Sequence, residues 1–314
     1  MKGLELSKAF YEEYGKPMLE NRFPDLLQFI AIGSVGRGSE HFGYDDEISQ
    51  DHDFEPGFCI FIPEADIIDE RTAFQLERAY AKLPKEYNGV KRLRMSPVGG
   101  NRNGVKRISE FYSEVIGAPD GVLSDEAWLR IPDYALAEAV NGEVFIDNYG
   151  EFTKIRESLT NMPEDIRLKR LAGNLLVMAQ SGQYNYSRCL KHNEPAAAQL
   201  ACNEFVIAAM KVVFLLNHRY MPFYKWSFRA LKQIENTAEI SEKLSSLLSG
   251  DNRDESISAK KHEIIEEIST IITDDLKERG LTVYPSSELE AHAYYVNDKI
   301  RDASIRNMHI LEAV

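Results

Sequence analysis

Five residues between positions 33 and 53 have side chains and spacings that suit phosphate and metal chemistry. Gly33 and Ser34 end an apolar run, Arg37 follows closely, and Asp51 and Asp53 stand two positions apart. In an extended strand, residues i and i+2 point to the same face, so the two aspartates would project side by side. Adjacent carboxylates repel each other unless a cation separates them, and Mg²⁺ takes oxygen ligands from carboxylates and substrate phosphates. The pair therefore predicts a magnesium site.

The glycine-serine turn predicts the complementary half of a site, a cradle for anions. Backbone N–H groups of Gly33 and Ser34 would hold phosphate oxygens if they are exposed where a strand passes into a helix. The Ser34 hydroxyl adds a donor, and the Arg37 guanidinium adds a charged fork for the same phosphates. We therefore expect the turn and the two aspartates to face each other across a gap of nucleotide size.

Short apolar runs on both sides of these residues predict the strands that hold them. Residues 26–32 (LLQFIAI) end at Gly33, and residues 57–63 (GFCIFIP) follow the Asp pair. A further strand is predicted at 143–147 (EVFID), after the turn pair Asn141-Gly142. Helices are predicted over residues 4–19, 69–83 and 105–116, with a loop at 97–104. The first half of the chain is therefore predicted to be a mixed α/β unit.

The second half of the chain has helical periodicity almost throughout. Pro163 and Pro195 each open a helical pattern, and isoleucine and leucine recur at spacings of three and four over residues 264–276. Ser287 and Glu290 form a capping-box signal for the last helix. The sequence thus predicts an α+β fold, with a small mixed-sheet domain over residues 1–150 and an all-α helical bundle domain over residues 151–314.

Composition limits the class of function. A formal net charge of −13 disfavours long nucleic acids as partners, because their binding normally rests on a basic protein surface. The longest apolar run, residues 205–216, has Lys211 inside it, and no signal-peptide pattern opens the chain. Cys59, Cys189 and Cys202 have no CxxC spacing and are expected to be reduced packing residues. We expect a cytoplasmic protein, without a membrane partner, that acts on a small molecule or a protein.

The pattern Gly33-Ser34, Arg37-Gly38 and Ser49-x-Asp51-x-Asp53 resembles the signature of the DNA polymerase beta-like nucleotidyltransferase superfamily. Members of that superfamily carry a Gly-Gly or Gly-Ser turn followed by Asp-x-Asp. The whole chain, including the stretches GEVFIDNYGEF and NHRYMPFYKW, resembles a bacterial family of uncharacterised function placed in that superfamily. The stretch HFGYDDEI makes the gap between turn and Asp pair longer than in the compact members, and leaves the roles of the acidic residues in that stretch open.

The resemblance implies transfer of a nucleoside monophosphate, with AMP expected, from ATP or another nucleoside triphosphate to an acceptor hydroxyl, releasing pyrophosphate. It implies two Mg²⁺ ions held by Asp51, Asp53 and a third carboxylate, for which Asp147 is our candidate. The alternative for Asp147 is that it caps the turn after EVFID. The resemblance also implies a basic residue from the helical domain at the nucleotide. Lys225 and Arg188 are candidates, with an ordinary surface role as the alternative.

Two other classes of function stay open. The protein would be a nucleotide-binding sensor if it bound ATP without transfer, or a toxin-like enzyme if it modified a protein or transfer RNA. The glycine spacing in GSVGRG fits neither a dinucleotide fingerprint nor a Walker loop. Aromatic residues of the helical half either stack on a ligand or pack the bundle, and packing is favoured; these are Tyr184, Tyr186, Tyr220, Tyr224 and Trp226.

Overall fold

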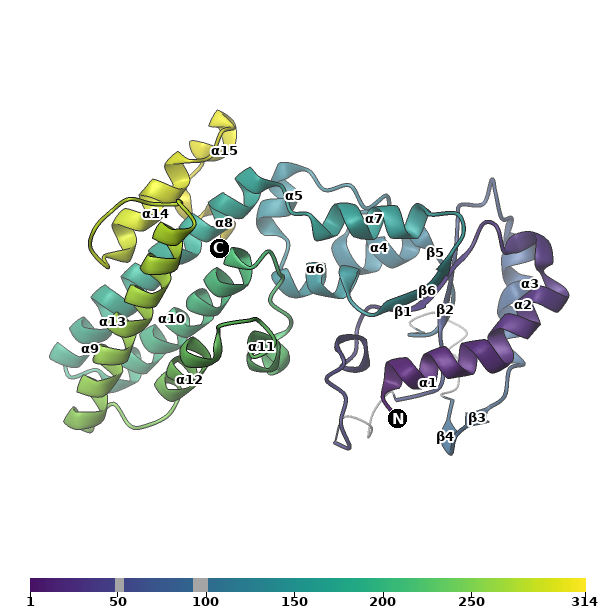
Figure 1. Cartoon of the computed structure of the whole chain (residues 1–314), viewed down its shortest axis with the longest axis horizontal. Coiled ribbons are helices and arrows are strands. Elements are labelled where there is room, and N and C mark those ends of the chain that lie inside the picture. Colours follow the sequence, from purple (N-terminus) through teal and green to yellow (C-terminus); the bar gives the residue numbers. More distant parts are fainter. Residues whose placement is uncertain (49–53, 93–100) are drawn as a thin grey trace. The chain divides into compact units, whose positions relative to one another are not determined.

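The computed structural model describes residues 1–48, 54–92 and 101–314, which form two compact units. The first unit comprises residues 1–123 and 135–161, and the second comprises residues 124–134 and 162–314. The first unit combines helices with a small mixed sheet, and the second is helical, as the prediction of an α+β fold with a helical C-terminal region requires (Figure 1). The domain boundary predicted at residue 150 stays a prediction. Contacts group residues 151–161 with the first unit and residues 124–134 with the second.

Four strands form the sheet of the first unit in the order β5-β2-β1-β6. They are β1 (Ala31–Ser34), β2 (Cys59–Ile62), β5 (Gly104–Arg107) and β6 (Glu143–Asp147). Strand β1 runs antiparallel to both β2 and β6, whereas β2 runs parallel to β5. Ser34 therefore lies at the C-terminal end of an interior strand, next to the N-terminal end of β2.

Side chains alternate along the strands, so the buried residues of β1 and β2 project from both faces of the sheet, and helices cover each face. Ile60 of β2 packs with Phe10 and Leu76 in one core, which involves α1 (Gly3–Phe10), α2 (Lys16–Arg22) and α3 (Glu70–Ala81). Phe61 points to the opposite face, where its ring stacks on Phe152 at a centroid distance of 4.1 Å. That second face is covered by α4 (Ile108–Ile116) and α7 (Glu151–Thr160) (Figure 1).

Shorter elements complete the first unit. A π-helical turn, Tyr11–Gly15, joins α1 to α2, and 3₁₀ turns occupy Pro24–Leu26 and Glu40–Phe42. Strands β3 (Glu86–Tyr87) and β4 (Val90–Lys91) form a hairpin, and α6 (Asp133–Val140) precedes β6. The hairpin was absent from the sequence prediction, although its turn pair Asn88-Gly89, with φ of +48° and +78°, is a hairpin signal.

The predicted strand at 143–147 is confirmed as β6, and the predicted strand at 57–63 contains β2. The helix predicted over 105–116 is wrong for its first turn, because residues 104–107 form β5 and pair with β2. The helix begins only at Ile108, where the Arg107 backbone N–H donates to the Glu110 carboxylate at 3.1 Å. Pairing with β2 is a long-range contact, which helical periodicity alone does not indicate.

The second unit is a set of helices around α8. Its helices are α5 (Asp125–Arg130), α8 (Glu164–Met178), a π-helical segment (Ala179–Tyr186), α9 (Ser187–Lys191), α10 (Pro195–Leu216), α11 (Tyr224–Leu231), α12 (Ala238–Leu247), α13 (Glu255–Glu278), α14 (Leu289–Asp298) and α15 (Ala303–Arg306), with a 3₁₀ turn at Ile310–Ala313. By length and composition α10 is apolar enough to cross a membrane, but 67% of its apolar window is buried in the described protein, as in a core helix of a soluble protein.

Candidate functional site

The segment after β1 is a compact turn held by the side chain of Asn141. The Gly36 N–H donates to Asn141 Oδ1 at 2.8 Å, and Asn141 Nδ2 donates to the Gly36 carbonyl at 2.7 Å. Gly36 has a φ of +100°, which favours glycine. The predicted exposed junction between strand and helix is wrong, because Gly33 and Ser34 are buried in β1 and a 3₁₀ turn follows. The backbone N–H groups of Gly33 and Ser34 are therefore not exposed to a bound anion.

Ser34 and His41 form a buried hydrogen-bonded pair beneath this turn. His41 Nδ1 lies 3.0 Å from the Gly36 carbonyl, so Nδ1 carries the proton and Nε2 is left as an acceptor. Ser34 Oγ lies 3.1 Å from Nε2 and donates to it. Burial, aided by the charge of Arg102, lowers the pKa of His41 to about 3. The Ser34 hydroxyl thus donates to a neutral histidine, whereas the sequence predicted a donor to phosphate.

This histidine makes the stability of the first unit depend on pH. The unfolded chain protonates His41 near its ordinary pKa of 6.5, whereas the folded state stays neutral down to about pH 3. Stability is therefore lost as the pH falls below 6.5, by about 2 kcal/mol from this group between pH 6.5 and pH 5. Glutamine keeps a donor and an acceptor but does not titrate. We therefore expect His41→Gln to lack this loss of stability between pH 6.5 and pH 5.

Hydrogen exchange of peptides from β1 and β2, corrected for the intrinsic effect of pH, measures this difference. It is the suitable probe because both tryptophans, Trp128 and Trp226, lie in the second unit, so their fluorescence does not report on β1. An identical pH dependence of protection in wild type and His41→Gln between pH 6.5 and pH 5 would contradict the assignment of a neutral histidine.

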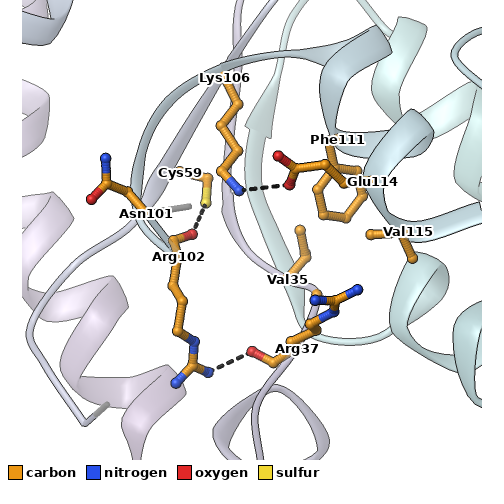
Figure 2. Close-up of a pocket in the computed structure, with 10 residues that line it drawn as sticks. Val35, Arg37, Cys59, Asn101, Arg102, Lys106, Phe111, Glu114 and Val115 are labelled. Atoms are coloured by element: carbon orange, nitrogen blue, oxygen red, sulfur yellow. Dashed lines mark hydrogen bonds and ion pairs between the residues drawn. The ribbon is translucent and has the colours of Figure 1, made fainter. Parts of the chain in front are cut away.

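A cavity of about 290 Å³ opens beside the turn, on the sheet face that α4 covers. Cys59 lies on the same face of β2 as Phe61, and Lys106 stands opposite Phe61 in the parallel register. Both side chains therefore face α4, which contributes Glu114 to the wall, and the turn contributes Arg37 (Figure 2). The cavity is thus built from parts of the first unit that lie far apart in the sequence.

The cavity wall is rich in cationic side chains. The Lys106 ammonium lies 3.4 Å from the Glu114 carboxylate and is directed into the cavity (Figure 2). Arg102 pairs with Glu40 and also donates to the Arg37 carbonyl, so it joins the loop before β5 to the turn after β1. The Arg37 side chain is 73% exposed. Each of these cations has a carboxylate partner, Glu114, Glu40 or Glu138, so an anion would meet paired cations, of which Arg37 is the most exposed.

Arg37 is the most exposed of these three cations. Its Nε lies 3.5 Å from the Glu138 carboxylate, and burial raises the pKa of Glu138, an effect that Arg37 opposes. The Cys59 thiol donates to the Arg102 carbonyl at 3.2 Å, and burial raises its pKa to about 11. Cys59 is therefore a neutral packing residue, as the sequence predicted. Arg37, by contrast, is placed to meet an incoming anion.

Asp51 and Asp53 lie outside the described residues. The strand that follows them is β2. It begins with Cys59, which pairs with Gly33 near the end of β1. Among residues 1–48, 54–92 and 101–314, no group of three or more His, Cys, Asp or Glu side chains is arranged to hold a metal ion. That finding leaves the predicted magnesium site of the Asp pair untested.

The structure does not bring Asp147 to the glycine-serine turn. Asp147 pairs with Ala31, whereas Glu143 at the other end of β6 pairs with Ser34. Asp147 therefore lies about 10 Å from Ser34, measured along the strand. Its carboxylate accepts from the Gly150 N–H at 2.8 Å and the Thr153 N–H at 2.7 Å. Asp147 thus caps the start of α7, the alternative that the sequence left open, and we leave it out of the proposed metal site.

Residues 128–227 match a family model described as a domain of unknown function (DUF4037). The matched segment runs from α5 to α11 and includes β6, but it does not include the residues of the turn or the Asp pair. No curated protein matches the chain. The match thus shows a domain without an assigned function at residues 128–227, and assignment to the nucleotidyltransferases remains a proposal.

Arg188 and Lys225 both lie in the DUF4037 segment, on the second unit. Both are exposed, and each lies over an aromatic ring of its own unit. The Arg188 guanidinium is 5.5 Å from the Tyr184 ring centroid and donates to the Tyr184 hydroxyl at 3.0 Å. The Lys225 ammonium is 5.1 Å from the Trp226 ring centroid. These contacts suit surface residues, and a role toward a nucleotide stays a prediction.

The sequence prediction missed three residues of the site: His41, Arg102 and Lys106. His41 lies in a 3₁₀ turn and Arg102 in a loop, where no periodicity marks a side chain as buried or as part of a wall. Lys106 was assigned to a helix, and only the pairing of β5 with β2 shows that it faces α4. The composition of the loop GGNRNG does offer a signal, since its one cation stands between residues typical of turns.

Proposed function

We propose that the protein is a metal-dependent nucleotidyltransferase, which transfers the nucleoside monophosphate of ATP or another nucleoside triphosphate to an acceptor hydroxyl. One observation carries this proposal. Strand β1 ends at Ser34 where β2 begins, beside a cavity with Arg37, Arg102 and Lys106 in its wall. The Asp pair precedes β2 in the sequence, so a predicted metal-binding motif leads into a strand that borders a cavity with three cationic side chains in its wall.

The cationic residues divide into binding and positioning roles. Arg37 and Lys106 offer charged donors to the phosphates, and positioning with electrostatic stabilisation accounts for most of the rate in phosphoryl-transfer reactions. Arg102 acts through others, because it holds the Arg37 carbonyl and the Glu40 carboxylate. The Ser34–His41 pair stabilises the turn from below. We therefore expect Arg102, Ser34 and His41 to be positioning residues.

The donor chemistry fits a magnesium ion. The carboxylates of Asp51 and Asp53 are hard oxygen ligands, and the cationic wall fits the phosphates that share such an ion. When bound, Mg²⁺ supplies charge neutralisation at the phosphates and lowers the pKa of the acceptor hydroxyl. In the reaction, the acceptor oxygen bonds to the α-phosphorus, the bond from that phosphorus to the bridging oxygen breaks, and pyrophosphate leaves. The hydroxyl proton passes to solvent.

The direct test is transfer of label from α-labelled ATP. Pure protein is incubated with this nucleotide, Mg²⁺ and a cell extract, and both labelled products and pyrophosphate are measured. We expect label in an acceptor together with pyrophosphate, and no transfer when EDTA removes the metal. Label in a metabolite, a protein or transfer RNA identifies the acceptor class. Binding of ATP without release of pyrophosphate in any extract would instead identify a sensor and overturn the proposal.

A further inference from the structure

A second cavity, of about 460 Å³, lies wholly within the second unit. The loop after α5, helix α10 and the segment that precedes α11 form its wall. Its volume falls in the range of about 300–1,000 Å³ that is usual for small-molecule sites. Apart from Glu312, Ala313 and Val314, all of its lining residues belong to the DUF4037 segment. The cavity is therefore mainly a feature of the part of the chain that the family model matches.

Aromatic side chains at this cavity are exposed instead of packed. Tyr134 and Phe223 are each 42% exposed, and Tyr224 is 74% exposed. The Tyr134 and Phe223 rings meet edge to face at 5.8 Å, and the Phe223 and Tyr224 rings lie 4.5 Å apart. A contiguous group of exposed rings beside a cavity is typical of a binding site for an apolar or planar group. These rings therefore favour an aromatic ligand.

One cation of the cavity wall has no direct partner among the described residues. Asp133 pairs with Arg170 at 3.0 Å, and Glu312 pairs with Arg130 at 3.1 Å, so both side-chain carboxylates of the wall have an arginine partner. Lys211, on α10, has neither an ion pair nor a hydrogen bond with any residue in the described parts of the chain, and its side chain is half-buried. An ammonium group in such a place favours an anionic partner.

We infer that this cavity binds a planar aromatic molecule that carries an anionic group, with the rings of Tyr134 and Phe223 against the plane and the Lys211 ammonium against the charge. Neither feature is used by the proposed nucleotidyltransferase reaction, whose cavity lies in the other unit. The site requires both parts of the ligand, because the exposed rings recognise the apolar plane and the unpaired cation selects the charge. It is therefore a second small-molecule site, independent of the proposed function.

Two fluorescent probes with the same rings separate the two contributions. 1-Anilinonaphthalene-8-sulfonate carries one anionic group, and N-phenyl-1-naphthylamine lacks it. We expect the sulfonate to bind with one saturable site and the neutral probe to bind more weakly. Lys211→Gln should weaken the sulfonate about tenfold and leave the neutral probe within twofold, whereas Phe223→Ala should weaken both. Lys232→Gln, which removes an exposed lysine outside the cavity, should change neither.

Thermal unfolding of each variant confirms that it is folded before affinities are compared. Unchanged affinity of the sulfonate for folded Lys211→Gln overturns the inference, as does binding that does not saturate. Displacement of the probe by ATP with Mg²⁺ would also overturn it, because the site would then not be separate from the proposed nucleotide site. Failure of the nucleotidyltransferase assay leaves these binding measurements unaffected, so the two proposals fail separately.

Discussion

The Asp51→Asn/Asp53→Asn double variant is expected to release pyrophosphate at least about 10³-fold more slowly than the wild type. Metal ions supply several kcal/mol of stabilisation to developing charge, and each 1.36 kcal/mol is a factor of ten in rate. Asparagine keeps the shape of aspartate but removes the charge that binds Mg²⁺. Pyrophosphate release at saturating ATP and Mg²⁺ measures this effect, together with the affinity for ATP in the absence of metal.

A matched control separates loss of metal ligands from loss of general negative charge. Asp46 and Glu47 are exposed acidic residues of the same acidic stretch. Asp46→Asn/Glu47→Gln therefore removes the same number of charges, and we expect its rate to stay within about threefold of the wild type. If both double variants lose activity equally, the stretch acts through its charge and the assignment of Asp51 and Asp53 as metal ligands is wrong.

The elements that the sequence predicts well are those whose signals are local. Strand β6 follows the Asn141-Gly142 turn and has the predicted bounds, and α10 begins at Pro195 as predicted. β5 could not be predicted in this way, because residues 104–107 become a strand only through pairing with β2. The fold class was therefore predictable from periodicity, whereas the fourth strand of the sheet depends on tertiary contact.

The candidate site shows the same division. Residue types near Gly33 predicted a turn after the strand, but they did not predict the partner of Ser34. His41 reaches Ser34 only because a 3₁₀ turn follows the glycines, where the sequence favoured a helix. Asp147 presented two chemically reasonable roles, and the choice between metal ligand and cap depends on its register against Ala31. Distances between segments decide such roles, and a sequence pattern does not contain them.

The turn also depends on the absence of a side chain at Gly142, next to β6. Its N–H donates to the His41 carbonyl at 2.9 Å, and its φ is +69°. A Cβ atom there would lie 2.1 Å from the Ser34 carbonyl oxygen and 2.9 Å from Val35 Cα, so the backbone of the turn would have to move. The left-handed conformation and the backbone clash both oppose a side chain at this position.

We expect Gly142→Ala to destabilise the first unit by about 3–5 kcal/mol, from backbone strain together with the clash. Gly117→Ala is the matched control, because Gly117 has a φ of +72° and its Cβ would meet no atom within 4 Å. That variant should lose only about 1 kcal/mol, the effect of the backbone conformation alone. Hydrogen exchange of peptides from β1 and β6 measures both variants. Equal losses would show that contact with the Ser34 carbonyl contributes nothing, and that the turn does not depend on close approach of residue 142.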